Sequence, residues 1–206
     1  MSKVSPSVIK LRKKQETNTK RKGDLATNPE MWAALEDGEL LNAILEDFYD
    51  QVYVDPQLAH FFKDSTKSRA IEKQYLFLKR IFTGEKCYFG ERPRNAHHWM
   101  VISDELFDYR EKLMEDTLRK HGLEEHLIKQ WRALEEIFRK QIVKSKPFNK
   151  KIGGIEIQAE GYEVDTLTVG SMCDVCHTEL APGTQISYHT RTGKVFCENC
   201  TPEVDI

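Results

Sequence analysis

A pair of neighbouring histidines lies in the stretch of this chain that most invites a chemical role. His97 and His98 fall within residues 84–107, which also contain two glycines and a proline. Glycine and proline are poorly tolerated inside helices, so this stretch is predicted to be an irregular connection between helical segments. Loops that present histidine from a rigid helical scaffold often bind ligands or transfer protons. The loop around His97 is therefore a candidate functional site.

Four of the five cysteines form a second candidate site. They make two CxxC pairs separated by twenty residues: Cys173, Cys176, Cys197 and Cys200. In a reducing compartment such pairs more often bind metal than form disulfides, and four thiolates suit tetrahedral zinc. An iron site of the rubredoxin type is the alternative, although rubredoxins carry glycine after each pair, where this chain has His177 and Thr201. His177 and a further histidine, His189, are expected to be surface residues.

Apolar periodicity predicts that helices hold the histidine loop. A short helix is expected from 29 to about 36, because Asn28 is a good N-cap and proline follows it. Apolar residues at spacings of three and four then predict a second helix: Leu41, Ile44, Leu45, Phe48, Tyr49 and Val52. The same signals predict three more helices: one beginning at Ser65 or Thr66, one from Ser103 to Gly122, and one from 123 to about 144.

The composition divides the chain into four parts. Residues 1–28 are basic and lack apolar periodicity, which predicts a disordered tail. Residues 29–145 are expected to form an all-α domain, and the proline, glycine and lysine content of 146–170 predicts a linker with a short strand. Residues 171–206 are predicted to form a small β-hairpin module that resembles a zinc ribbon. This module has few apolar residues, so zinc would supply most of its folding energy.

Bulk properties exclude several classes of function. The formal net charge is −2, so there is no overall electrostatic case for nucleic-acid binding. The longest apolar runs are short, which predicts no membrane-spanning helix, and the basic N-terminal stretch lacks the apolar run of a secretory signal. A cytoplasmic location is the default expectation.

The helical part resembles a known family, the truncated (two-over-two) haemoglobins, over about residues 29–145. The residues that carry the resemblance are these: Phe48-Tyr49, the segment DPQLAHFF ending at Phe62, Gln74 with Phe77-Leu78, Tyr88 and Gly90, Ala96-His97, Ile102-Ser103, and Phe107. Their order and their spacings agree together with the family pattern. The expected fold is therefore mainly α, a two-over-two helical sandwich followed by the small β zinc ribbon.

The resemblance implies haem b as a cofactor, with His97 as the axial ligand of its iron. In the family the proximal histidine is followed five residues later by Ile, then Thr or Ser, then a Phe, and this spacing fits His97 and not His98. Tyr49 and Gln74 match the distal hydrogen-bonding residues. The expected haem pocket also includes Phe62, Phe77, Leu78, Tyr88, Phe107 and Arg110. Candidates for pairing with the haem propionates are Lys73, Arg92 and Arg94.

One residue departs from the family pattern. Arg110 stands where several branches of the family carry an aromatic residue and others an apolar one. Its charge is expected either near the distal pocket or turned outward by snorkelling.

The implied function is the binding of oxygen or another diatomic ligand, such as nitric oxide or carbon monoxide, at a His-ligated haem iron. Haem-dependent redox chemistry with nitric oxide or oxygen is a further possibility for such a protein. The zinc module is expected to be structural and to contact a protein partner. Two alternatives are a haem-based gas or redox sensor that signals through the zinc ribbon, and a haem-free interaction protein with a globin fold.

Overall fold

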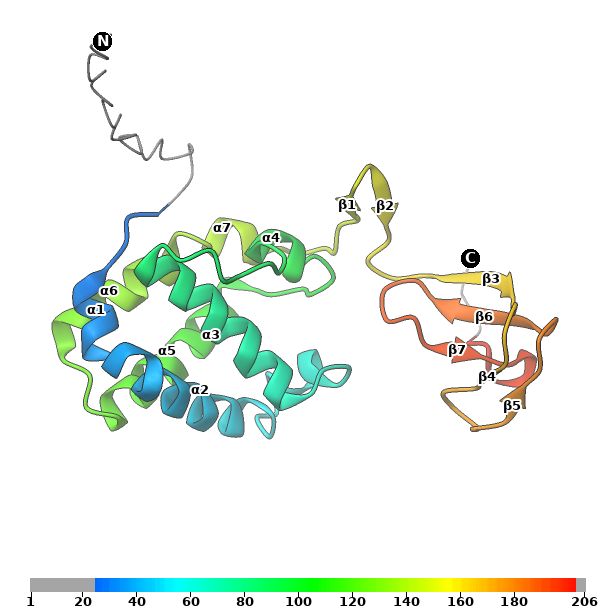
Figure 1. Cartoon of the computed structure of the whole chain (residues 1–206), viewed down its shortest axis with the longest axis horizontal. Helices are drawn as coiled ribbons and strands as arrows, with labels where there is room; N and C mark the ends of the chain where they lie inside the picture. The colour runs from blue at the N-terminus through cyan, green and yellow to red at the C-terminus, as the bar shows by residue number, and fades with distance from the viewer. Residues whose placement is uncertain (1–24, 203–206) are drawn as a thin grey trace, which may run out of the picture.

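The computed structural model describes residues 25–202, which form a helical part and a β part joined by a small hairpin (Figure 1). Most of the tail expected over 1–28 lies outside the described residues. The helical part contains these helices and 3₁₀ turns: α1 (Pro29–Ala34), η1 (Glu36–Gly38), α2 (Glu39–Val52), η2 (Ala59–Phe62), α3 (Lys67–Thr83), α4 (Pro93–Ala96), α5 (Asp104–Lys120), α6 (Glu125–Glu136) and α7 (Arg139–Ile142). Within the described residues no helix is both long enough and apolar enough to cross a membrane.

Short-range capping sets where the helices begin. Asn28, Thr66 and Ser103 each accept a hydrogen bond from the backbone N–H three residues later, which satisfies one of the free donors at the helix start. Gly84 ends α3 with a φ of 78°, a conformation that costs glycine little. The helix expected from 123 to 144 is divided into α6 and α7. The backbone N–H groups of Ile137 and Phe138 bond to the carbonyl three residues earlier instead of four, which interrupts the α-helical pattern.

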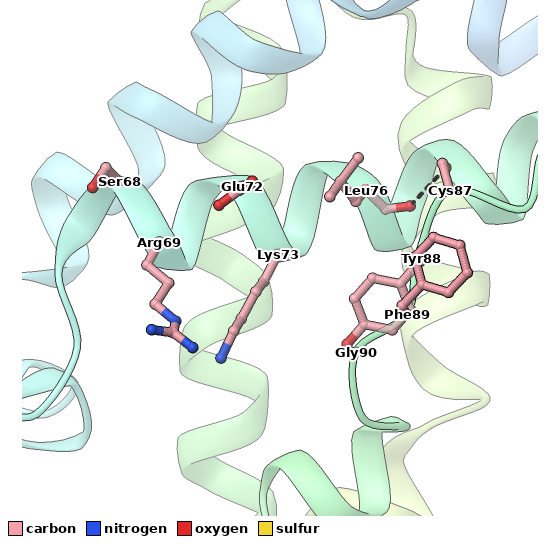
Figure 2. A pocket seen from close by; sticks show the side chains of 9 residues that line it. All are labelled: Ser68, Arg69, Glu72, Lys73, Leu76, Cys87, Tyr88, Phe89 and Gly90. Carbon is pink, nitrogen blue, oxygen red and sulfur yellow. Dashed lines mark hydrogen bonds between the residues drawn. The ribbon is translucent and has the colours of Figure 1, made fainter.

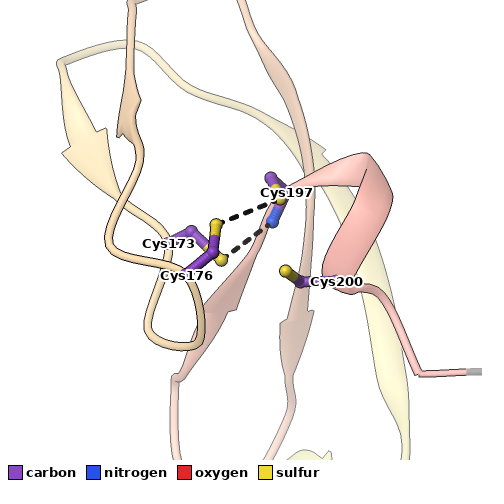
Figure 3. Close-up of side chains that lie close together, drawn as sticks. All are labelled: Cys173, Cys176, Cys197 and Cys200. Atoms are coloured by element: carbon purple, nitrogen blue, oxygen red, sulfur yellow. Dashed lines mark hydrogen bonds between the residues drawn. The ribbon is translucent and has the colours of Figure 1, made fainter.

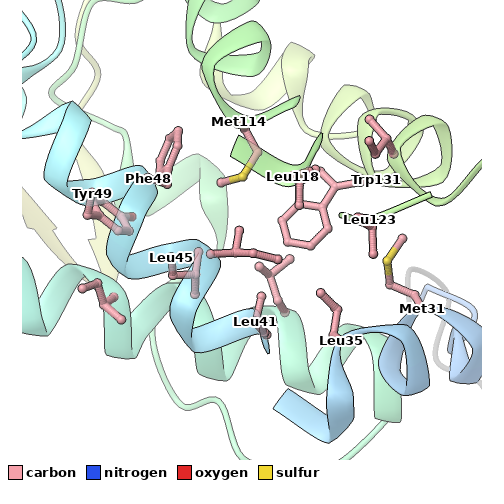
Figure 4. Packing of buried hydrophobic residues seen from close by; sticks show 14 of the residues in the cluster. Met31, Leu35, Leu41, Leu45, Phe48, Tyr49, Met114, Leu118, Leu123 and Trp131 are labelled. Carbon is pink, nitrogen blue, oxygen red and sulfur yellow. The ribbon is translucent and has the colours of Figure 1, made fainter. Parts of the chain in front are cut away.

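The helices pack as two layers around one apolar core. Helix α2 packs against α3 and α5, and α5 packs against α6. Figure 4 shows the centre of this core, where side chains from α1, α2, α5 and α6 meet. Members that are at most 1% exposed include Met31, Leu35, Leu41, Leu45, Phe48, Met114, Leu118 and Trp131. Each such side chain contributes about 1.5–3 kcal/mol by leaving water, so this core holds the layers that frame the histidine loop.

The β part consists of short antiparallel strands. Strands β1 (Lys150–Ile152) and β2 (Ile155–Ile157) form the joining hairpin. Strands β3 (Tyr162–Thr166), β6 (Gln185–His189) and β7 (Val195–Phe196) form a three-stranded sheet. Strands β4 (Ser171–Met172) and β5 (Glu179–Leu180) form a second hairpin, and the turn η3 (Glu198–Cys200) ends this part.

The segment 146–170, predicted to be a linker with a short strand, contacts both the helical part and the β part. It contains three strands, and β3 pairs with β6, so the β module begins before residue 171. Its start is also tied to the helical part: the Phe148 N–H donates to the His98 carbonyl at 3.0 Å, and Lys150 pairs with Glu91 at 2.7 Å. The sequence did not reveal these contacts, because the partners lie 50 and 59 positions earlier in the chain.

Candidate functional site

A cavity of about 990 Å³ lies among α2, α3, α5 and the histidine loop, with part of its wall formed by the β part. Its volume lies at the upper end of the range for small-molecule and cofactor sites. The residues that the sequence pointed to meet on its walls: Tyr49, Phe62, Lys73, Gln74, Phe77, Leu78, Tyr88, His97, Phe107 and Arg110. Phenylalanine and leucine side chains from three helices thus give the cavity an apolar wall, with a few polar groups set into it.

His97 lies on the cavity wall just after the four-residue helix α4. Its Nδ1 is 2.8 Å from the carbonyl oxygen of Pro93, one turn earlier, so Nδ1–H is the donor and Nε2 is the nitrogen left for a ligand. Burial lowers the pKa of His97 to about 4, which keeps the ring neutral at neutral pH. A neutral imidazole whose second nitrogen is held by a carbonyl is the arrangement that metal-binding histidines adopt.

The neighbouring His98 has a different environment. It is 1% exposed, its Nδ1 lies 3.0 Å from the Phe148 carbonyl oxygen, and it is absent from the cavity wall. Its ring also meets the Phe148 ring edge-on, with centroids 6.2 Å apart. His98 therefore fastens the segment after α7 to the histidine loop.

Tyr49 and Gln74 form a hydrogen-bonded pair on the α2–α3 side of the cavity. The Tyr49 hydroxyl donates to Gln74 Oε1 at 2.6 Å, an assignment that leaves the Gln74 amide NH₂ free to donate. Burial raises the pKa of Tyr49 to about 12, so the phenol keeps its proton. Phe62 contacts the Tyr49 ring edge-on at 5.7 Å between centroids. The pair therefore presents the Gln74 amide NH₂ as its free donor at one wall of an apolar cavity, while the Tyr49 hydroxyl proton is used to orient that amide.

Arg110 lies on the cavity wall and is not turned out to solvent. Its Nη1 is 2.5 Å from Glu135 Oε1 and 2.7 Å from Glu111 Oε1, and its guanidinium stacks 4.8 Å from the Phe48 ring centroid. Burial opposes the charge of Arg110, but the acidic side chains of Glu135 and Glu111 outweigh this effect and raise the pKa of Arg110. The charge that departs from the family pattern is thus held by acidic partners.

The two acidic partners were not predicted from the sequence. Burial raises the pKa of Glu111, so this carboxyl keeps its proton at neutral pH. Burial also opposes the charge of Glu135, yet the attraction of Arg110 outweighs it and lowers the pKa of that carboxyl. The site therefore carries one ion pair and one neutral acid. A sequence signal existed only for Glu111, whose position falls on the buried face of α5.

Replacing Arg110 by methionine is expected to destabilise the haem-free protein by about 3–5 kcal/mol at pH 7, because Glu135 would stay buried without its cation. In the parent, the lowered pKa of Glu135 gives stability above its ordinary pKa, which is lost as the pH falls through the lowered value. The variant lacks this stabilisation, so the difference between the two proteins should shrink toward pH 4. Urea unfolding at both pH values measures it.

The double variant Arg110→Met/Glu135→Gln is the matched control for this prediction. It removes both charges and is expected to recover most of the lost stability. A single variant within 1 kcal/mol of the parent at pH 7 would contradict a buried ion pair at this position.

Cations near the cavity differ from those expected. Lys73 lines the cavity and so does Arg69, which was not predicted. Figure 2 shows both side chains extending from the same side of α3, beside a shallower hollow of about 480 Å³ that Tyr88 shares. Arg92 and Arg94 do not line the cavity, and the Arg94 guanidinium stacks 4.6 Å from the Phe148 ring centroid. The structure therefore does not bring these two propionate candidates to the cavity.

The four cysteines converge in the β part (Figure 3). Their sulfur atoms all lie within 4.8 Å of one another, and Cys176 Sγ is 3.7 Å from Cys197 Sγ. Tetrahedral zinc with Zn–S bonds of about 2.3 Å requires sulfur separations of about 3.8 Å. The donor set and its spacing fit a tetrahedral metal ion.

The two histidines near this site have different environments. His177 is exposed, as expected, and follows Cys176 with a φ of 58°, a strained conformation where glycine would cost less. His189 was expected at the surface, but it is 8% exposed, so that expectation is wrong. Its Nε2 is 3.0 Å from Glu160, and its Nδ1 accepts from the backbone N–H groups of Arg191 and Thr192. The buried ring therefore organises the turn after β6.

A helical sandwich with a histidine and a tyrosine–glutamine pair across an apolar cavity defines a globin-type ligand site. The pattern of the bacterial-like globin family matches residues 31–144, more than half of the chain. The chain belongs to this family.

Individual relatives agree with this assignment. A group 1 truncated haemoglobin of Synechocystis is 32% identical over 88 residues, which are 41% of this chain and 71% of that protein. One from Tetrahymena thermophila is 26% identical over 88 residues, 43% of this chain and 73% of that protein. The truncated haemoglobin structure of Tetrahymena pyriformis in its Fe(III) form has 25% identity and a TM-score of 0.51, and covers 55% of this chain and 97% of that one. The expected truncated globin followed by a small β part with clustered cysteines is confirmed.

Proposed function

We propose that the helical part binds haem b in its cavity, with His97 as the axial ligand, and that the protein binds a diatomic ligand there. The observation that carries this proposal is the state of His97: a neutral ring on the cavity wall, with Nδ1 held by Pro93. Membership of a globin family supports the cofactor, because the truncated haemoglobins that the chain is similar to are haem proteins.

The chain offers each kind of group that a haem site needs. Haem, when bound, supplies an iron with one open position for oxygen, nitric oxide or carbon monoxide. Phe62, Phe77 and Phe107 supply apolar walls for the porphyrin. The Gln74 amide, oriented by the Tyr49 hydroxyl, supplies a donor for a polar ligand, and Lys73 supplies a cation for a carboxylate.

A haem titration of the purified full chain tests the proposal. Absorption in the Soret region should rise until about one haem is bound per chain, and carbon monoxide should then shift the spectrum of the reduced protein. A chain that shows no saturable haem spectrum would refute this function.

Removing the Tyr49 hydroxyl is expected to speed the release of oxygen. A hydrogen bond to a charged acceptor contributes about 1.5–3 kcal/mol, which corresponds to about tenfold to hundredfold in ligand lifetime. Tyr49→Phe keeps the ring against Phe62 and removes only the hydroxyl, which donates to Gln74 in this structure and would turn to a bound oxygen. Carbon monoxide carries less negative charge, so its release should change less. Rapid mixing of the ferrous protein measures both rates.

The variant Gln74→Leu extends this test. Since Tyr49 and Gln74 bond to each other, the double variant should show a non-additive change in the oxygen off-rate. If Tyr49→Phe leaves that rate within twofold of the parent, Tyr49 is a core aromatic residue without a role toward the ligand.

We also propose that the four cysteines bind one structural zinc ion. The sulfur spacing supports a tetrahedral ion, and the small apolar core of the β part, formed by Cys173, Leu180 and Ile186, supports a structural role for it.

A further inference from the structure

The turn between β6 and β7, residues 190–194, forms part of the wall of the cavity in the helical part. In Figure 1 this turn faces the helices. Arg191, Thr192 and Lys194 line the same cavity as His97 and Tyr49. The cavity is thus completed by a module that lies outside the region matched by the globin family, which ends at residue 144.

Charged contacts hold the turn against the helical part. Lys194 Nζ is 2.6 Å from Asp64 Oδ1, just after η2, and Arg191 Nη2 is 3.8 Å from Asp64 Oδ2. The hydrogen bond from Lys194 lowers the pKa of Asp64, so this carboxylate is ionised at neutral pH. The Arg191 guanidinium also stacks 4.0 Å from the ring centroid of Trp99, in the histidine loop.

Hydrogen bonds within the β part fix the conformation of the turn. His189 Nδ1 accepts from the N–H groups of Arg191 at 3.2 Å and Thr192 at 3.3 Å, and Gly193 allows the tight return with a φ of 71°. Strand β7 leads from the turn directly to Cys197. The four-cysteine site therefore anchors the strand that carries the turn.

Arg191 has a donor without a partner. Its side chain is 16% exposed, and among the described residues its buried Nε–H has no hydrogen-bond acceptor, since Glu160 Oε1 is 3.7 Å away. Buried donors in proteins are almost always satisfied, and the fork of an arginine matches a carboxylate. An unpartnered guanidinium N–H at a cavity wall points to an anion that enters the cavity.

We propose that the β6–β7 turn is a clamp on the haem cavity: Lys194 fastens it to Asp64, Arg191 binds a haem propionate, and the metal in the four-cysteine site holds the clamp in place. This assignment rests on the proposed haem binding. It gives the β module a role within its own chain, because loss of the metal releases the clamp and speeds the loss of haem.

Haem release from the ferric full-length protein to excess apomyoglobin tests the clamp. Arg191→Ala should release haem about tenfold faster than the parent, because it removes a charged hydrogen bond. Arg191→Lys keeps the charge without the fork, so its rate should lie between the two. Asp64→Asn should also speed release. The control is Lys151→Ala, which removes a cation that is 72% exposed and away from the cavity.

Treatment with a chelator distinguishes release of the clamp from a general loss of protein stability as the cause of faster haem release. EDTA should speed haem release from the parent, but should add little in Arg191→Ala, in which the clamp has already lost its contact with haem. In the haem-free full chain, amide hydrogen exchange over residues 59–66 should rise on metal removal and in Asp64→Asn, since both free the turn from Asp64.

Each outcome decides the assignment. A parent that binds haem and releases it at the same rate as Arg191→Ala and the chelated protein overturns the clamp and leaves the proposed function intact. Equal acceleration by Lys151→Ala also overturns it. A parent without a haem spectrum refutes the proposed function, and the propionate contact with it, while the exchange data still report whether the metal fixes the turn.

Discussion

Replacing His97 by alanine is expected to abolish the haem spectrum of the protein. His97 is the histidine on the cavity wall, and Pro93 leaves its Nε2 free for iron. Alanine removes this ligand and opens space in the site, so absorption in the Soret region should not saturate when haem is added at micromolar concentration. The haem titration of the parent provides the reference.

His98→Ala is the matched control, because it changes the same residue type one position away. His98 fastens the Phe148 segment and does not line the cavity, so this variant should lose stability yet keep a saturable haem spectrum. Helical circular dichroism of both variants establishes that they are folded. If only the change at His98 removed the haem spectrum, the assignment of the ligand would be wrong.

Removing the metal from the four-cysteine site should unfold the β module and leave the helices folded. The module has few buried apolar residues, Cys173, Leu180, Ile186 and Phe196, which give too little apolar area for independent stability. Structural zinc contributes about 10–16 kcal/mol in small zinc-binding peptides at pH 7, and this energy is folding energy. After EDTA treatment, amide exchange over 162–200 should become fast, while the helical circular dichroism should persist.

Two cysteine-to-serine variants test whether zinc binding depends on the four-cysteine site and not on Cys87. Cys173→Ser removes one of the four proposed ligands and should give the same unfolding as EDTA, with zinc falling from about one per chain toward zero. Cys87→Ser should change neither, because the Cys87 thiol lies beside α3, 3.6 Å from the Leu76 carbonyl oxygen. Protein that is free of zinc yet folded over 162–200, or that holds iron there, would refute the zinc assignment.

Local signals in the sequence were sufficient for the elements of the fold. Asn28, Thr66 and Ser103 begin helices because a side-chain oxygen and a free N–H three residues on are neighbours in the chain. The CxxC pairs predicted the sulfur cluster for a similar reason, since each pair is a short-range unit. The order and spacing of the globin residues likewise indicated the family, and with it the set of residues that meets on the cavity wall.

Only the tertiary structure decided which partners the charged side chains contact. Arg110 lines the cavity because Glu135, on another helix, holds it, whereas Arg94 stacks on Phe148 and stays out of the cavity. The contact between Lys194 and Asp64 joins residues 130 positions apart. Long charged side chains can turn to several partners, so their fate depends on which elements the folded backbone brings near. Apolar periodicity and capping carry no information on that choice, because they report only neighbours within a few turns of chain.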